Sequence, residues 1–374
     1  MKISCKKYIS CFVFLILLSC SKSVIEEQKI SDNEFSINLK WNKAYTDDTF
    51  ERNRIALDWF LSYLGARNNF TEVHNEGVLY NTPFIVLKVD KLGFNSEALI
   101  VFKRIHNEIK KTEEYLTKGA IDLARYITLI LGDSRTYFDI TGVPRSLDIL
   151  KDRYTLQDSL GYVNNSSVSI THRLISYSNY ENNGQFFLAA EIDSITGEPL
   201  EFESLEILGN GQLVFGIFDK NGQLKEAANP QFTMAGKPGK CMWCHEVNIQ
   251  PLITPQQNLE GYLNYESFKE LLRESNRKLQ EFQNEIWENE SLKNKQNHIF
   301  MEIAYISYLE PSLERLSNEW NMSVQEVQEK LRNLETHEHD EFDFLGNLYT
   351  REEVQEFAPY ESIVTPNSVR EIDN

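Results

Sequence analysis

The stretch from Gln185 to Phe218, QFFLAAEIDSITGEPLEFESLEILGNGQLVFGIF, holds three short runs of β-branched and aromatic residues separated by turn sequences. Such runs, divided by Gly, Pro, Asn and Asp, are typical of strands joined by hairpins. The strongest turn signal is Gly209-Asn210-Gly211, and Asn182-Asn183-Gly184 separates a further run on the N-terminal side. We therefore predict a central antiparallel β-sheet. Its expected strands are Val168–Ser176, Gln185–Ile192, Phe202–Leu208 and Gln212–Phe218.

Segments with helical patterns flank this sheet on both sides. In each of them apolar residues recur at helical spacing, and Ser323 with Glu326 gives a capping-box pattern at the start of the last. One further strand is expected at Phe84–Val89. The predicted class is α+β: a helix-rich N-terminal part, the central sheet, a loop that carries the sequence CMWCH, and a helical C-terminal part. The expected helices are Thr49–Leu64, Ser96–Lys118, Ile121–Leu131, Tyr265–Trp287, Ile299–Leu309 and residues 324–334.

The N-terminus has the pattern of an export signal. Basic residues are followed by an apolar run from Cys11 to Leu18, which is too short to span a bilayer as a helix. The run ends in Leu17-Leu18-Ser19-Cys20, which resembles the bacterial lipoprotein signal. That resemblance implies cleavage before Cys20, lipidation of Cys20, and anchorage on the periplasmic side or outer membrane; the alternative is an ordinary signal peptide. The expected divisions are a signal peptide (1–19), a polar tether (20–40), an α+β domain (41–228), and the CMWCH region with its helices (229–374).

The chain is strongly acidic, with a net charge of −18 over 374 residues. Removal of the three lysines in the signal would bring the charge to −21. Nucleic-acid binding requires a basic face, so the composition argues against a nucleic-acid partner. We therefore expect contact with the membrane to depend on the lipid and not on the domain.

The cysteines single out one short motif. Of five cysteines, Cys5 and Cys11 lie in the expected signal and Cys20 is the lipidation site that the resemblance implies, which leaves Cys241 and Cys244. In an exported protein a disulfide between residues so close together closes almost no loop and stabilises little. The sequence Cys241-Met242-Trp243-Cys244-His245 resembles the attachment motif of c-type cytochromes. The resemblance implies one covalent haem c, bonded through Cys241 and Cys244, with His245 as the proximal iron ligand.

Two other uses of the cysteine pair stay open at this point. One is a zinc site that adds distant histidines, for which the cluster His337-Glu338-His339-Asp340-Glu341 is the obvious source. The other is a redox or structural disulfide. For a haem, Met301 and Met234 are equal candidates for the sixth ligand, and Trp243 is expected either at the haem edge or in the core. His298 is expected to be exposed at the start of its helix.

These observations predict an exported, lipid-anchored protein with one c-type haem. One-electron transfer with an unidentified redox partner is the simplest role. Two alternatives are a haem enzyme with an open distal position, such as a peroxidase-like protein, and a surface-binding lipoprotein whose cysteine pair serves zinc or a disulfide.

The lipoprotein interpretation predicts that Cys20→Ser releases the exported protein from the membrane fraction. Two or three acyl chains hold a protein firmly on a bilayer, whereas the polypeptide alone has no comparable attraction. Fractionation of cells followed by immunoblotting measures the distribution, with Ser19→Ala as the matched control expected to stay with the membrane. Retention of the Cys20→Ser protein in the membrane fraction would contradict lipid anchorage.

Overall fold

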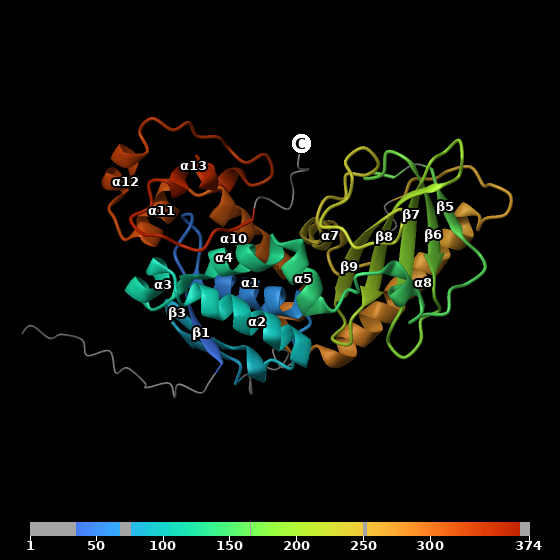
Figure 1. The fold of residues 1–374 in the computed structure, drawn as a ribbon, viewed down its shortest axis with the longest axis horizontal. Helices are drawn as coiled ribbons and strands as arrows, with labels where there is room; N and C mark the ends of the chain where they lie inside the picture. The colour runs from blue at the N-terminus through green and yellow to red at the C-terminus, as the bar shows by residue number, and fades with distance from the viewer. Residues whose placement is uncertain (1–34, 68–75, 165, 250–252, 367–374) are drawn as a thin grey trace, which may run out of the picture. The chain divides into compact units, whose positions relative to one another are not determined.

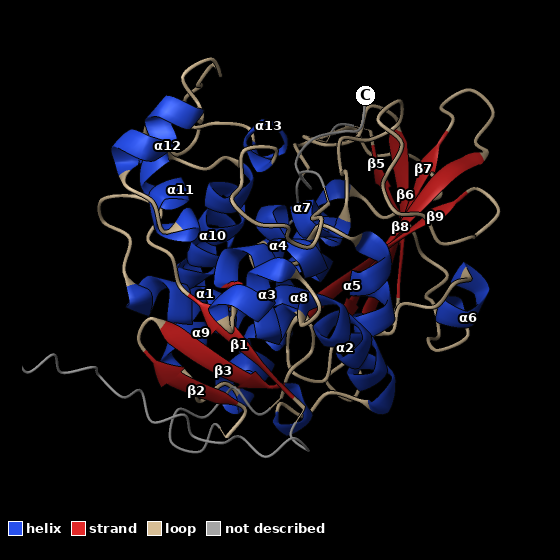
Figure 2. Cartoon of the chain, turned by 60° about the vertical axis from the view of Figure 1, so that its left-hand side comes forward, coloured by secondary structure: helices blue, strands red, loops and turns tan. Residues whose placement is uncertain are grey.

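The computed structural model describes residues 35–67, 76–164, 166–249 and 253–366, and the predicted export signal with Cys20 lies outside these ranges. The described residues form a mixed α+β structure with thirteen α-helices and two sheets. Figure 1 shows the order of the elements, and Figure 2 shows helices between the two sheets. No helix among the described residues combines the length and apolar character needed to cross a bilayer.

The first sheet has four strands in the order β2-β3-β1-β4. Strand β1 pairs antiparallel with β3 and parallel with β4, and alternate residues of β1 and β3, such as Leu39 and Leu87, are fully buried. The prediction of a strand at Phe84–Val89 is confirmed by β3. Residues 36–40, the last of the range expected for the polar tether, form β1 and bury apolar side chains. The strands are β1 Ser36–Lys40, β2 Val78–Asn81, β3 Phe84–Lys88 and β4 Ile121–Asp122.

Most helices that precede the second sheet begin at a polar capping residue. The single helix predicted over Ser96–Lys118 is instead two helices, because the Thr112 hydroxyl accepts a hydrogen bond from the Tyr115 amide and starts a new helix there. The predicted helix at Ile121–Leu131 begins two residues later, after β4, where Asp122 caps it. The elements are α1 Phe50–Tyr63, the 3-10 turn η2 Val89–Lys91, α2 Ser96–Ile109, α3 Glu113–Lys118, α4 Leu123–Leu131, α5 Ser134–Thr141 and α6 Leu147–Lys151.

The second sheet is the predicted central antiparallel sheet. Its five strands follow one another as a meander, in the order β5-β6-β7-β8-β9. The predicted turns are present: Asn182 and Asn183 have positive φ, and Gly211, with φ +78°, lies between β8 and β9. The strands are β5 Gly161–Val163, β6 His172–Tyr177, β7 Phe186–Ile192, β8 Pro199–Ile207 and β9 Leu213–Asp219.

The C-terminal part is helical, as predicted. The capping box of Ser323 and Glu326 is confirmed, with both of its reciprocal hydrogen bonds present. The loop predicted for CMWCH is a helix, α7, and this part of the fold prediction was wrong. The elements are α7 Pro238–His245, α8 Tyr265–Ile286, α9 Glu290–Lys293, η3 Lys295–His298, α10 Ile299–Leu309, α11 Leu313–Trp320, α12 Val324–Lys330, η4 Asp343–Leu345 and α13 Arg351–Gln355.

Elements from both sides of the expected division at residue 228 pack together. Helix α10 contacts α1 and α4, and α7 contacts β9 and α5. The main apolar cluster accordingly includes side chains from the first helices, from the second sheet and from α7, α8 and α10. The predicted parts 41–228 and 229–374 therefore share a core.

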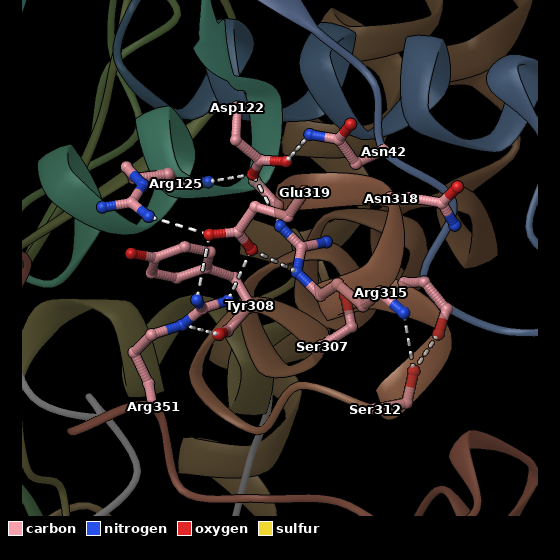
Figure 3. Close-up of polar contacts among 12 residues, drawn as sticks. Asn42, Asp122, Arg125, Ser307, Tyr308, Ser312, Arg315, Asn318, Glu319 and Arg351 are labelled. Carbon is pink, nitrogen blue, oxygen red and sulfur yellow. Dashed lines mark hydrogen bonds and ion pairs between the residues drawn. The ribbon is translucent and has the colours of Figure 1, made fainter. Parts of the chain in front are cut away.

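A buried ionic network joins the last helices to α4 (Figure 3). Glu319 on α11 is fully buried and accepts hydrogen bonds from Arg125 at 2.8 Å and from Arg351 at 3.0 and 2.9 Å. Arg315 lies 3.6 Å from the same carboxylate. All three guanidinium groups also lie against the ring of Tyr308, at 5.2, 4.1 and 5.4 Å from its centroid for Arg125, Arg351 and Arg315.

Two further carboxylates complete the charge balance of the network. Asp122 accepts a 2.6 Å hydrogen bond from Arg315, and Glu114 lies 3.3 Å from Arg125. Burial alone would raise the pKa of Glu319, but the Arg351, Arg125 and Arg315 guanidiniums hold it well below its usual value. Glu319 is therefore the buried anion that holds three cations, contributed by α4, α11 and α13, around one point.

The network predicts that Glu319→Gln lowers the free energy of unfolding by about 3–5 kcal/mol, because it leaves buried guanidiniums without their shared counter-charge. Glu314→Gln on the same helix is the matched control: its ion pair with Lys43 is partly exposed, and its loss should cost about 1 kcal/mol or less. Equilibrium unfolding in urea measures both.

The pH dependence of the same experiment has a definite sign. The folded-state pKa of Glu319 is lowered, so its ionised carboxylate adds to the free energy of unfolding above the unfolded-state pKa of about 4.3. That added stability is lost as the pH falls toward the folded-state pKa. The stability difference between parent and Glu319→Gln should therefore shrink in acid. Equal losses for Glu319→Gln and Glu314→Gln at neutral pH would contradict a central role for Glu319.

Candidate functional site

Helix α7 places the motif residues one helical turn apart. Pro238 occupies its first turn, where the missing amide hydrogen costs nothing, and the helix ends at His245. Cys241 and Cys244 are therefore neighbours on consecutive turns. The two cysteines are not joined by a disulfide.

The two sides of α7 have different environments. Met242 and Trp243 are buried in the main core, and the Trp243 ring lies 5.9 Å from that of Tyr305 on α10. Cys241 and His245 instead line a cavity. Of the two positions expected for Trp243, the structure shows the core position.

The cavity lies between the second sheet, α7 and α8. Its empty space, of about 850 Å³, includes space that is open to solvent. Strand alternation directs residues from all five strands toward it, and most of them are apolar. The lining residues are Val163, Ser166, Arg173, Ile175, Phe187, Ala189, Glu203, Ser204, Leu205, Phe215, Gly216, Ile217, Cys241, His245, Ile249, Ile253, Phe268 and Leu272.

Helix α8, which runs along the sheet in Figure 1, closes part of the cavity through two close contacts. Phe268 packs so near β5 that a Cβ on Gly161 would come within 2.6 Å of its ring, so this position requires glycine. Asn276 binds both backbone groups of Ile249, accepting from its amide at 2.5 Å and donating to its carbonyl. The segment that follows α7 is thereby fixed to α8.

A strained turn after α7 orients His245. Glu246 and Val247 both have positive φ, +46° and +63°, which is rare for a β-branched residue. This turn brings the Asn248 carbonyl within 3.0 Å of His245 Nδ1. A proton on Nδ1 donates to that carbonyl, and the imidazole lone pair is then on Nε2. Such a hydrogen bond fixes the tautomer and ring orientation of histidines that bind metals.

The electrostatics of the cavity favour uncharged forms of both motif residues. Burial is the main cause that lowers the pKa of His245, and the nearby positive charge of Arg173 lowers this pKa further. The hydrogen bond to the Asn248 carbonyl acts in the opposite direction. Burial raises the pKa of the Cys241 thiol, and the Glu203 carboxylate raises it further. His245 is thus held as neutral imidazole, which is the form that binds metals.

The sheet adds a charged group that the sequence analysis did not identify. Arg173 on β6 faces Glu191 on β7 in the strand register, and Glu203 on β8 lies on the same side of the sheet. Arg173 donates through Nε to Glu191 and through Nη2 to Glu203, at 3.2 and 3.1 Å. The signal in the sequence was a charged residue on the same face of each of three adjacent strands, Arg173, Glu191 and Glu203.

The structure does not bring the other predicted residues to this cavity. Met301 is fully buried in the main core and Met234 is 40% exposed in the loop before α7; neither lines the cavity. His298, expected to be exposed, is buried beside Trp59, because it ends a 3-10 turn that packs on α1. His337 pairs with Glu310 at 3.0 Å, and the His339 ring lies against Phe342.

The described part of the chain contains no group of three or more His, Cys, Asp or Glu side chains placed to hold a metal ion. Comparison of the chain with protein families, with curated proteins and with solved structures finds no match. The local chemistry of the cavity is therefore the basis for a functional assignment.

Proposed function

We propose that this chain is an exported, lipid-anchored protein that carries one covalent haem c in the cavity between the second sheet and α7. Cys241 and Cys244 are the attachment residues, His245 is the proximal ligand, and one-electron transfer is the simplest role. The observation that supports the proposal most directly is that Cys241 and His245 of one CxxCH motif line the same largely apolar cavity. The export signal supports the compartment, since c-type haem is attached outside the cytoplasm.

The residues present fit a haem in three respects. The cavity is mostly apolar, which suits a porphyrin. Cys241 lines it, whereas Cys244, one turn later on α7, is not among the residues that line it. His245 is held as neutral imidazole with Nδ1 engaged by the Asn248 carbonyl, which is the arrangement of a histidine ligand bound through Nε2.

Each part of the chain has a separate task in this proposal. When bound, the haem supplies a redox-active iron whose potential depends on its axial ligands and on the burial of the site. The apolar sheet face and α8 exclude water. The hydrogen bond from His245 Nδ1 to the Asn248 carbonyl orients the imidazole as the proximal ligand. The lipid on Cys20 keeps the protein at a membrane surface, where an unidentified partner exchanges electrons with it.

Covalent attachment is the first test of this proposal. The denatured parent protein should retain haem through acid–acetone extraction and stain for haem peroxidase activity in a gel, because two thioether bonds survive denaturation. Replacing both Cys241 and Cys244 by Ser should abolish the stain. An intact mass equal to that of the bare lipidated polypeptide would rule the proposal out. It would favour a zinc site or a disulfide at the cysteine pair, and metal analysis and thiol titration would distinguish these two alternatives.

The role of His245 gives a second test. His245→Ala should abolish the low-spin absorption bands or prevent maturation, because the iron loses its proximal ligand. The matched control is His172→Ala on β6, a histidine that pairs with Tyr162 at 2.6 Å and is not among the residues that line the cavity. Spectra of both variants identical to that of the parent would show that His245 does not bind the iron.

A further inference from the structure

The turn that orients His245 is itself fixed by one side chain. Asn248 supplies the backbone carbonyl that lies 3.0 Å from His245 Nδ1, and its side-chain amide donates back to the Glu246 carbonyl at 3.0 Å. Glu246 and Val247, between His245 and Asn248, have positive φ, a conformation that persists only where the surroundings hold it. The Asn248 side chain therefore keeps the strained turn, and with it the acceptor for His245, in place.

Two side chains from other elements reach the amide oxygen of Asn248. Lys295 Nζ in η3 donates to Oδ1 at 3.4 Å, and Gln280 Nε2 on α8 donates to the same oxygen at 3.5 Å. These distances are long for hydrogen bonds, but a charged donor also attracts the amide dipole electrostatically. The amide is thereby held at both ends: its oxygen accepts from η3 and α8, and its nitrogen donates to Glu246.

Lys295 brings a partly buried positive charge to this turn. Burial lowers the pKa of its ammonium to about 8, and no carboxylate among the described residues opposes this shift. The side chain is therefore still mostly protonated at pH 7. Lys293, two residues earlier, is instead exposed and pairs with Glu290 at 2.7 Å. Water and its counter-charge screen Lys293, so Lys295 has the stronger electrostatic effect on its surroundings.

We propose that Lys295 and the Asn248 side chain form a positioning unit for the proximal histidine, which holds His245 in its ligand orientation and raises the reduction potential of the haem. The inference rests on the proposed haem and adds the residues that set its potential. Groups that hold the second nitrogen of a histidine ligand tune the metal. Oxidised iron carries one more positive charge than reduced iron, so a cation behind the histidine favours the reduced form. Both residues act through His245 and are positioning residues.

The experiment measures the midpoint potential of the full-length, haem-loaded protein in detergent at pH 7 by spectroelectrochemical titration. Lys295→Gln removes the charge but keeps a hydrogen-bond donor. It should shift the balance between reduced and oxidised protein toward the oxidised form by about threefold or more, which lowers the potential by about 28 mV or more for a one-electron couple. Lys295→Arg should restore most of the parent potential. The matched control, Lys293→Gln, should have the potential of the parent.

A double-mutant cycle tests whether Lys295 acts through Asn248. Asn248→Ala keeps the backbone carbonyl that His245 contacts but removes the amide that holds the Lys295 ammonium, which is then free to turn toward solvent. Asn248→Ala should itself lower the potential, and the effect of Lys295→Gln should be at most half as large in the Asn248→Ala background. An equal effect of Lys295→Gln in both backgrounds would overturn the positioning unit.

The same measurements separate this inference from the proposed function. A parent protein with covalent haem whose potential is unchanged by Lys295→Gln, or by Asn248→Ala if Lys295→Gln does not mature, would overturn the inference and leave the haem assignment intact. A parent protein without covalent haem would overturn the proposed function itself.

Discussion

The inward face of the five-stranded sheet has to be covered, and the site depends on how this is achieved. An antiparallel sheet with one apolar face is stable only when other elements bury that face. Here the cover comes from later in the chain: α7 packs against β9, and α8 approaches β5 so closely that Gly161 has no room for a side chain. The cover is incomplete, and the space that it leaves is the cavity lined by Cys241 and His245.

This arrangement gives α7 two functions at once. One side of the helix contributes Met242 and Trp243 to the main core, so that the helix is anchored by burial. The other side presents Cys241 and His245 to the cavity, and the strained residues Glu246 and Val247 turn the chain so that the Asn248 carbonyl can accept a hydrogen bond from His245. Strained backbone persists only where the surrounding structure holds it, and it is concentrated at functional sites.

Buried charge serves different purposes in two places. Around Glu319, the charges of three arginines are balanced by buried carboxylates, and the network ties α11 and α13 to α4. At the sheet wall, the Arg173 guanidinium on β6 is shared between Glu191 on β7 and Glu203 on β8. The first arrangement joins helices, whereas the second joins three neighbouring strands of the sheet.

The sequence alone determined the α+β class, the central hairpins, the capping box at Ser323 and the position of the CxxCH motif, because each follows from local periodicity or spacing. It did not determine that the motif is helical, that Ser96–Lys118 is divided at Thr112, or that residues 36–40 form a strand. It also did not identify Arg173, Glu191 and Glu203 as one group of paired charges. Their meeting depends on the register of three strands and on helices that follow them by several tens of residues. Local pattern reports which face of a strand a residue occupies; only tertiary packing decides what lies opposite that face, because the covering elements are chosen by shape and burial across the whole chain.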